Sequence, residues 1–423
     1  MPFSFSTALS GLTASSQSIS VNGNNIANAN TTGFKSNGIS FADVFTNSIG
    51  VRLNGAGAPV QTGSGVRVAD TPVNFGQGTI NNTDIPTNAA IEGNGFFVVT
   101  DSAGTVGYTR AGDFSLDKSG YLVPPGGQRV QGYTAVNGSI PAGTALTSLS
   151  IPIGSTLPPS VTTEATLRMN LNATDVVGTD FHTPVQVYDS KGVSHKLDMT
   201  FSKQADGSYK MSAKLDSDAA TTSVNGAAAS ATPVAVTFDA NGNLATPNTL
   251  SIVPDQTKLN GATLPSITIN LRQPAPPVGS GSGNITSFAA PSGVASTDQN
   301  GFAAGELTGL SQSADQNGEI FAVFSNGQRR LLGQIALATF NSQSGLRHLG
   351  GNRYGETITS GEPSIGTPGN GGRGAVVGSS LEQSNVDIAT EFTGLIIAQR
   401  SFQANSRVIT TISQTLQELL QIS

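Results

Sequence analysis

The most regular pattern of apolar and polar positions lies at the C-terminal end of the chain. From Asn385 to Ile422 there is no proline and one glycine, Gly394, so nothing in this stretch ends a long helix. Apolar side chains recur at every seventh position, at Ile388, Leu395, Phe402, Ile409 and Leu416. A second column lies three positions further on, at Glu391, Ala398, Asn405, Ile412 and Leu419. The columns predict an a/d heptad seam with two polar interruptions along a helix of about 55–60 Å.

The start of this helix carries capping residues. We expect Asn385 or Ser384 to cap it and Asp387 to lie in its first turn, where the helix dipole favours a carboxylate. A single helix with one apolar stripe is not stable in water, so a partner is expected.

A weaker stripe with the same spacing lies at the N-terminal end and could supply that partner. Phe5, Leu12, Ile19 and Ile26 recur at every seventh position, and Ala8, Ser15 and Asn22 lie three positions after the first three. The stretch is rich in Ser, Thr and Asn and contains Gly11 and Gly23, so its intrinsic helicity is poor. We predict that residues 1–30 form a helix by pairing, parallel or antiparallel, with residues 384–423 as a coiled coil.

Two interpretations of this helix pair stay open. In the first, the coiled coil staples the two ends of a monomer, and in the second it is a polymerisation element that packs against neighbouring subunits. Two helices bury only one seam, and further apolar residues of the C-terminal stretch lie off it. They are Phe392, Ile396, Ile397, Val408 and Leu420. Exposure of these side chains would indicate further partners.

Between the two ends the pattern changes to period two in short runs, which is typical of β-strands. One kind of turn separates the runs, with an Asp at its start and a Gly three positions later. Such turns begin at Asp101, Asp117, Asp189, Asp239 and Asp315. Asp accepts backbone N–H bonds at the start of a turn, and Gly supplies positive φ at its end. The pattern predicts an all-β body.

Clusters of Pro and Gly divide this body near residues 145–160 and at residues 274–283. The prediction is a mixed fold with long terminal α-helices, an all-β inner domain and an inserted β-rich outer domain. The helical domain comprises residues 1–30 and 384–423, and linker or hinge segments comprise residues 31–70 and 373–383. The inner β-domain comprises residues 71–147 and 298–372, and the outer one residues 148–297.

The amino-acid composition excludes some kinds of partner and chemistry. Charged residues make up 11% of the chain, against a usual value of about 25%. The net charge is −6 with no basic run, so no nucleic-acid partner is expected. The absence of Cys excludes disulfides and thiol catalysis and suits a protein that ends up outside the cytoplasm. No apolar run is long enough to span a membrane and the N-terminus lacks a Sec signal, so we expect no membrane insertion and export by another route.

No pattern predicts an enzyme. The only histidines are His182, His195 and His348, and none forms a metal-binding pair. The Asp–Gly turns lack the acidic ladder of a Ca²⁺ loop. Residues 115–118 fit S-x-x-K without its companion motifs, and residues 93–95 precede a strand rather than the helix of a dinucleotide site. We predict no catalytic, cofactor-binding or metal site.

Several segments resemble those of flagellar rod and hook proteins. Residues 24–35, NNIANANTTGFK, resemble the N-terminal signature of that family, and residues 384–387 and 398–405 its C-terminal signature. Residues 92–97 and 108–114 are similar to its shared β-domain, and residues 332–338 to the return half of that domain. Residues 150–297 match more loosely. The chain length and this large insert favour the hook members over the distal rod members.

The resemblance implies a subunit of a curved tubular polymer, the flagellar hook, which acts as a universal joint between rod and filament around a central export channel. The implied partners are other copies of the chain, the distal rod protein, the hook cap protein, the hook–filament junction protein and the flagellar type III export apparatus. The implied location is extracellular, in the hook of the flagellar basal body. The alternatives are another axial protein, such as a distal rod protein, or a secreted β-rich adhesin.

A bendable joint needs stiff and yielding parts. We predict that the polymerisation seam is made by the seven-residue columns Phe5, Leu12, Ile19, Ile26, Ile388, Leu395, Phe402, Ile409 and Leu416. We predict hinges at Thr31, Thr32, Gly33, Phe34 and Lys35 and at residues 371–378, because Gly-containing links yield most easily.

Overall fold

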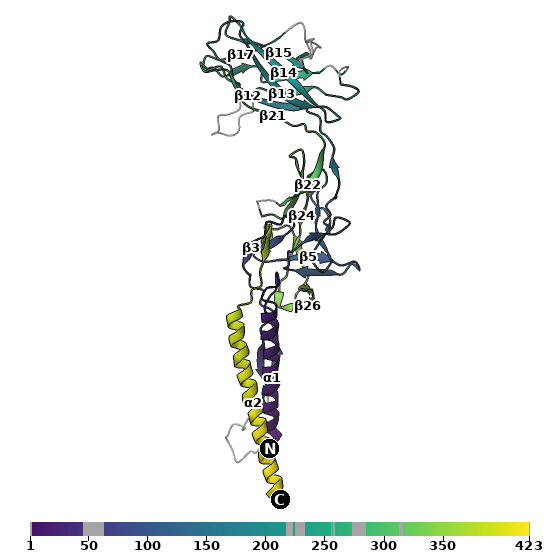
Figure 1. Ribbon diagram of the computed structural model, residues 1–423, viewed down its shortest axis with the longest axis vertical. Helices are drawn as coiled ribbons and strands as arrows, with labels where there is room; N and C mark the ends of the chain where they lie inside the picture. Colours follow the sequence, from purple (N-terminus) through teal and green to yellow (C-terminus); the bar gives the residue numbers. More distant parts are fainter. Residues whose placement is uncertain are drawn as a thin grey trace, which may run out of the picture. The chain divides into compact units, whose positions relative to one another are not determined.

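The computed structural model describes residues 2–44, 63–216, 223–224, 233–254, 256, 259–272, 285–312 and 316–422. The chain divides into two compact units. The first comprises Met1–Ile153, Gly309–Ala322 and Arg329–Ser423, and the second comprises Gly154–Thr308 and Val323–Gln328. Each is described by itself below, and Figure 1 labels their elements.

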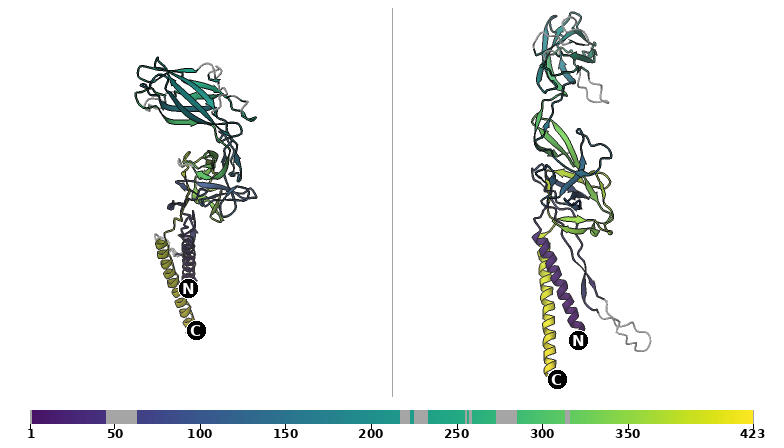
Figure 2. Two further views of the ribbon diagram at one scale, coloured as in Figure 1. Left: turned by 45° about the horizontal axis from the view of Figure 1, so that its top comes forward. Right: turned by 90° about the vertical axis from the view of Figure 1, so that its right-hand side faces the viewer.

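The two helices belong to the first unit. Helix α1 spans Pro2–Ala27 and α2 spans Ile388–Ile422, and they run antiparallel along each other (Figures 1 and 2). The expected cap of α2 was wrong: Asp387 Oδ1 accepts the N–H groups of Ala389 and Thr390 at 2.9 and 3.0 Å. Asp387 is thus the N-cap itself, because a carboxylate one residue before the helix reaches two of its free N–H groups. Within the described residues no helix is long and apolar enough to cross a membrane.

In helix α1 the hydroxyls of several small polar residues bond within the helix. Ser10, Thr13 and Ser15 donate to the carbonyls of Thr7, Leu9 and Gly11 at 2.8 to 3.0 Å. These bonds satisfy side chains that otherwise compete with the helical backbone. The two terminal helices were predicted correctly, whereas their packing as a coiled coil stays a prediction.

The β-structure of the first unit joins segments from both halves of the chain. Its strands are β1 Ser40–Asp43, β2 Val66–Asp70, β3 Ile80–Asn82, β4 Ala89–Glu92, β5 Phe96–Thr100, β6 Val106–Thr109, β7 Ser115–Leu116, β8 Leu122–Val123, β9 Arg129–Thr134, β10 Thr147–Ser148, β24 Arg329–Ile335, β25 Leu337–Thr339, β26 Arg347–Gly350, β27 Arg353–Gly355, β28 Ser364–Gly366, β29 Ala375–Gly378 and β30 Ser380–Glu382. Strands β22 Gly305–Gln312 and β23 Glu319–Phe324 each divide between the units. A short 3₁₀ helix covers Gln343–Gly345.

Pairing between distant strands closes this unit. Strand β3 pairs antiparallel with β30, placing Ile80 opposite Glu382, and β4 pairs antiparallel with β29. Strands β24, β9, β5, β6, β27 and β26 follow one another across the largest sheet. Part of the segment predicted as a linker forms the antiparallel β1–β2 ribbon, and residues 45–62 lie outside the described residues.

An aromatic cluster lies in the core of the first unit. The rings of Phe75, Phe96, Phe340 and Tyr354 meet edge to face, with centroids 5.2 to 6.0 Å apart. Tyr108 joins them at 4.8 Å from Phe340. Edge-to-face contacts add to the stabilisation from buried area.

The second unit packs two sheets face to face. One sheet has the order β16-β19-β20-β12-β21 and the other the order β13-β14-β15-β17-β18. The strands of this unit are β11 Thr156–Leu157, β12 Glu164–Asn170, β13 Asp180–Tyr188, β14 Ser194–Lys203, β15 Tyr209–Leu215, β16 Ser223–Val224, β17 Val234–Phe238, β18 Leu244–Thr246, β19 Thr249–Val253, β20 Ile267–Asn270 and β21 Gly293–Gln299. Burial alternates along β12 and β14, as expected for strands with one face on a core.

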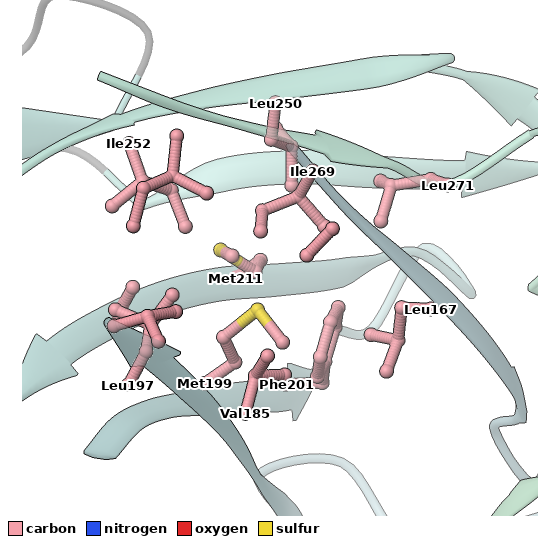
Figure 3. Close-up of a cluster of buried hydrophobic side chains, with 14 of the residues drawn as sticks. Leu167, Val185, Leu197, Met199, Phe201, Met211, Leu250, Ile252, Ile269 and Leu271 are labelled. Carbon is pink, nitrogen blue, oxygen red and sulfur yellow. The ribbon is translucent and has the colours of Figure 1, made fainter. Parts of the chain in front are cut away.

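Side chains of the two sheets meet in one apolar core (Figure 3). Leu167, Leu250 and Ile269 come from the first sheet, and Met199 and Phe201 from the second, and all five are fully buried. The β-rich character of the insert was predicted, and its two-layer arrangement was not.

The Asp–Gly turns form as predicted wherever they are described. The carboxylates of Asp101, Asp117, Asp189 and Asp239 each accept the N–H groups two and four residues on, at 2.8 or 2.9 Å. The Gly three residues on has φ between 78° and 85° in each turn. Asp315 and the predicted boundary at residues 274–283 lie outside the described residues.

Candidate functional site

The predicted heptad columns mark the covered face of each helix over most of its length. On α2 the partly or fully buried members are Glu391, Leu395, Ala398, Phe402, Asn405, Ile409 and Ile412. On α1 they are Ala8, Leu12, Ser15, Ile19, Asn22 and Ile26. Two predicted seam residues, Phe5 and Ile388, are exposed, and the side chains of Leu416 and Leu419 lie outside the described part.

A second set of large apolar side chains on the helices is exposed to solvent. The exposed apolar set comprises Phe5, Leu9, Ile388, Phe392, Ile396, Ile397 and Val408, with exposed fractions from 43% to 60%. Ile388, Phe392 and Ile396 are spaced four apart, so they lie on one stripe along α2. The off-seam residues of the prediction are therefore exposed where they are described, and the side chain of Leu420 is not described. A contiguous apolar stripe on a helix surface indicates an interaction site.

Smaller and more polar residues line much of the space along the helix pair. A groove of about 530 Å³ lies along the pair and the β1–β2 ribbon. Gly11, Ala14, Ser15, Ser18, Asn22, Gly394, Ala398, Ser401 and Asn405 line it, with Phe41, Val66 and Ile397 as its large apolar members. Small side chains thus line this groove, while about half of the large apolar side chains of the pair remain exposed.

A buried cluster of charges joins the connections of the two helices. Lys35 follows α1, Glu382 precedes α2, and neither side chain is exposed at all. Lys35 Nζ donates to Glu382 Oε1 at 2.5 Å and to the Gly76 carbonyl at 2.8 Å. The Glu382 carboxylate also accepts the Gly78 N–H at 2.9 Å. Burial lowers the pKa of Lys35, and the Glu382 carboxylate opposes that shift.

Arg110 completes this cluster from the β-domain side. Its Nη1 donates to Glu382 Oε2 at 3.2 Å, and its Nη2 donates to the Gly93 carbonyl at 2.7 Å. The guanidinium also lies over the Phe96 ring, 5.5 Å from its centroid. We call Lys35, Arg110 and Glu382 the buried charge triad. Two cations share one carboxylate here, so removal of Glu382 would leave both buried without a counter-charge.

Two asparagines strengthen the same junction. Asn385 Oδ1 accepts the Ser36 N–H at 2.8 Å, and Asn385 Nδ2 donates to the carbonyls of Asn74 and Gly76 at 2.8 and 3.0 Å. The fully buried Asn25 exchanges two hydrogen bonds with the Asn37 backbone, at 2.8 and 2.9 Å. Each amide side chain acts as a two-point bridge, Asn25 between α1 and the segment that follows it and Asn385 between the two ends of the chain.

These contacts bear on both predicted hinges. Gly33 donates its N–H to the Glu382 carbonyl at 2.7 Å, has φ of 65°, and has the Arg110–Ala111 backbone where a Cβ would lie. Within residues 371–378, Ala375–Gly378 form β29, and Gly374 donates to the Asn94 carbonyl at 2.6 Å. Hinges there stay predictions, and the hydrogen bonds count against free movement at either place.

Pattern reasoning missed the roles of Arg110, Glu382 and Asn385. One signal was available for the triad: Lys35 is the first charged residue of a chain in which charge is scarce. A lone Lys after a long uncharged stretch is a candidate for a specific buried pairing, because nothing in its surroundings explains it as part of a solvated charged face.

The spacing of the three histidines predicted no metal site, and the structure shows which groups each of them contacts. His195 lies between two carboxylates, with Nδ1 at 2.6 Å from Asp216 Oδ2 and Nε2 at 3.2 Å from Asp189 Oδ2. His182 contacts the Thr200 hydroxyl, and His348 lies beside Tyr354. Among the described residues no group of three or more His, Asp or Glu side chains could hold a metal ion.

Four family models match successive parts of the chain. The models for "flagella basal body rod protein" and "flagellar basal body rod FlgEFG protein C-terminal" match residues 5–35 and 377–422. The model for "flagellar hook protein FlgE/F/G D1 domain" matches residues 90–162, and that for "flagellar basal body protein FlaE D2 domain" matches residues 153–302. The terminal matches cover α1, α2 and two members of the triad.

Whole-chain relatives decide the family. The flagellar hook protein FlgE of Salmonella typhimurium is 34% identical over 99% of this chain and 100% of its own length. The chain belongs to the flagellar hook protein family. The hook protein FlgE of Borreliella burgdorferi is 33% identical over 98% of both chains, so the match extends to distant members of the family. This is a family of structural subunits of the flagellar hook, not a family of enzymes.

A solved hook protein shares the fold. The crystal structure of the flagellar hook protein FlgE2 of Helicobacter pylori covers 70% of this chain and 98% of its own, with a TM-score of 0.51 and 16% identity. At that identity the likeness concerns the fold alone.

Proposed function

We propose that this hook-family chain polymerises through its terminal helix pair into a curved tube that acts as a universal joint. In this proposal the tube transmits motor torque from the rod to the filament and leaves a central channel open for export. The chain works outside the cell, without a cofactor and without catalysis. Its partners are other copies of itself, the distal rod protein, the hook cap protein, the hook–filament junction protein and the type III export apparatus.

The observation that carries this proposal is the exposed apolar set on α1 and α2. Soluble monomers rarely expose many large apolar side chains together, whereas this set lies along one pair of helices. Burial of one such side chain stabilises by about 1.5–3 kcal/mol. Contact with further copies would bury several per subunit, which is enough to drive assembly.

Within each subunit we propose that α1 and α2 pair as an antiparallel coiled coil. The covered residues follow the heptad columns, and a supercoil keeps such columns in contact along the full helix. The buried charge triad would then fix this pair to the β-domain, so that torque passes from the helices to the outer parts of the tube. The hinge role of residues 31–35 and 371–378 remains part of the proposal only for movements that leave these hydrogen bonds intact.

Assembly of full-length variants tests the proposal. Phe392→Asp with Ile396→Asp places two charges on the exposed stripe, and we expect no tubes by electron microscopy and no sedimenting polymer. Val176, which is 79% exposed in the second unit, supplies the matched control Val176→Asp, which should assemble normally. Circular dichroism would verify that the β-structure of both variants is intact. Tubes of normal yield from the stripe variant would contradict the proposal.

A further inference from the structure

Each helix of the pair places a glycine against an asparagine of the other. A Cβ at Gly11 would lie 2.8 Å from Asn405 Nδ2 and 3.1 Å from its Cγ and Oδ1. A Cβ at Gly394 would lie 2.8 Å from Asn22 Nδ2. No carbon fits at these distances unless the amide moves. The two contacts are reciprocal, since α1 supplies Gly in one and Asn in the other.

A third contact belongs to the same alignment. Asn25 Nδ2 donates to Glu391 Oε1 at 3.1 Å. Asn25 lies 3 residues after Asn22 on α1, and Glu391 lies 3 residues before Gly394 on α2. Likewise, Asn22 lies 11 residues after Gly11 on α1, and Gly394 lies 11 residues before Asn405 on α2. All three contacts therefore define one antiparallel register.

The apolar columns cannot define this register by themselves. They repeat every seventh residue on both helices, so a slide of one helix by seven residues reproduces the same pattern of apolar positions. The asparagine and glycine positions do not repeat in this way, and Gly394 is the only glycine of α2. After such a slide Gly11 would face Ala398 or Ile412 instead of Asn405. Polar residues within a seam are known to specify register in this manner.

We propose that the contacts Gly11–Asn405 and Gly394–Asn22 are register keys of the helix pair. The keys select one alignment among those that the heptads allow. They thereby fix how the exposed residues of α1 line up with those of α2 on the surface presented to the next copy. The two glycines weaken isolated helices, and a larger residue at either position would have to displace the facing amide. This inference rests on the proposed assembly through the helix pair.

Glycine-to-alanine substitution at three positions of the full-length chain tests the register keys. Gly11→Ala and Gly394→Ala place a methyl group against an asparagine, whereas Gly23→Ala is the matched control, since nothing lies within 4 Å of a Cβ there. Ala is the better helix former at all three positions. We expect Gly23→Ala to assemble at least as well as the parent. Gly11→Ala should raise the critical concentration for polymerisation about ten-fold, the effect of one lost contact. Gly394→Ala should have the smaller effect, since there only one atom of the amide lies close.

A swap separates register from general loss of packing. The double variant Gly11→Asn with Asn405→Gly moves one key to the opposite helix, and it should restore assembly relative to Gly11→Asn alone. A Gly11→Asn effect that the second change does not relieve would overturn the proposal. So would a Gly11→Ala variant that behaves like Gly23→Ala.

The register itself can be measured because the native chain has no Cys. Nitroxide labels on Thr13→Cys and Gln403→Cys, both exposed positions, would report one distance by pulsed electron resonance in tubes diluted with unlabelled protein. A slide of seven residues displaces one label by about 10 Å along the pair. We expect one distance in the parent and in Gly23→Ala, and a shifted or broadened distribution in Gly11→Ala. An unchanged distance in Gly11→Ala would overturn the register role. Normal assembly of the Phe392→Asp, Ile396→Asp variant would instead overturn the underlying assembly proposal.

Discussion

The sandwich of the second unit and the helix pair of the first solve the problem of apolar surface in opposite ways. The sandwich buries its large side chains against each other: Leu167, Met199, Phe201 and Ile269 are wholly inaccessible. Along the helix pair, glycine, alanine, serine and asparagine line a groove, while Phe392, Ile396 and Ile397 are about half exposed or more. The sandwich is thus complete within a single chain, whereas we expect the helix pair to be completed by other copies.

The buried charge triad links the helix connections to the β-structure of the first unit, and its disruption should have the largest effect on stability. Glu382→Gln leaves Lys35 and Arg110 buried without a counter-charge, and it should lower the free energy of unfolding of the first unit by about 3–5 kcal/mol. Lys35→Met leaves a balanced Arg110–Glu382 pair, so it should cost less. Lys196→Met, at an exposed pair with Asp198, is the control and should change stability by less than about 1 kcal/mol. Denaturant titration of the full-length variants would measure all three. A smaller loss of unfolding free energy for Glu382→Gln than for Lys35→Met would contradict the role of Glu382 as the shared counter-charge.

A cavity in the sandwich should separate stability from assembly. Phe201→Ala removes a fully buried ring and should destabilise the second unit by about 3–5 kcal/mol. Because the assembly surface lies on the helices, the variant should still polymerise at temperatures where the sandwich remains folded. Thermal unfolding followed by sedimentation would measure both properties. Loss of assembly without loss of fold would show that the sandwich takes part in the essential contacts.

The pH dependence of the sandwich should report His195. Burial by itself would lower the pKa of His195, but hydrogen bonds to Asp216 and Asp189 outweigh it and raise the pKa. A raised pKa stabilises the fold fully below the ordinary pKa of His, and this contribution is lost as pH rises through the folded-state pKa. The second unit should therefore be less stable at pH 9 than at pH 6. His195→Gln should flatten that difference, as measured by denaturant titration at both pH values. A parent protein that is equally stable at both values would contradict the assignment.

The smallest expected effect concerns the start of α2. Asp387→Ala removes the acceptor of the Ala389 and Thr390 N–H groups and should cost about 1 kcal/mol of local helix stability. In assembled tubes, hydrogen exchange at these two amides should accelerate, while exchange in the sandwich stays unchanged. Exchange at the parent rate would show that another group caps the helix.

Local patterns predicted much of the fold because they act over short distances. The heptad columns from Glu391 to Ile412 marked the covered face of α2, and the spacing of an Asp three positions before a Gly marked turns such as that at Asp117. Both depend on neighbours within a few residues. Residues whose roles depend on distant partners were not predictable in this way. Arg110 contacts Glu382, and Asn385 contacts Ser36, across long stretches of sequence, and the pairing of β3 with β30 places Glu382 opposite Ile80.

For the same reason, the sequence predicted the exposed apolar set of the helices better than the contacts that align the two helices. Exposure of Phe392 and Ile396 follows from their position off the seam, whereas the contact of Gly394 with Asn22 requires the register to be known. A heptad pattern states which face of a helix is covered, but it does not state which residue lies opposite.

Hydrogen exchange measured by mass spectrometry, on dilute protein and on assembled tubes, would show whether the helix pair is completed by other copies. We expect peptides of α1 and α2 to exchange rapidly in dilute protein and slowly in tubes. Peptides of β12, β14 and β15 should be equally protected in both states, because the sandwich is complete within one chain. Equal and strong protection of α2 in dilute protein and in tubes would contradict the account.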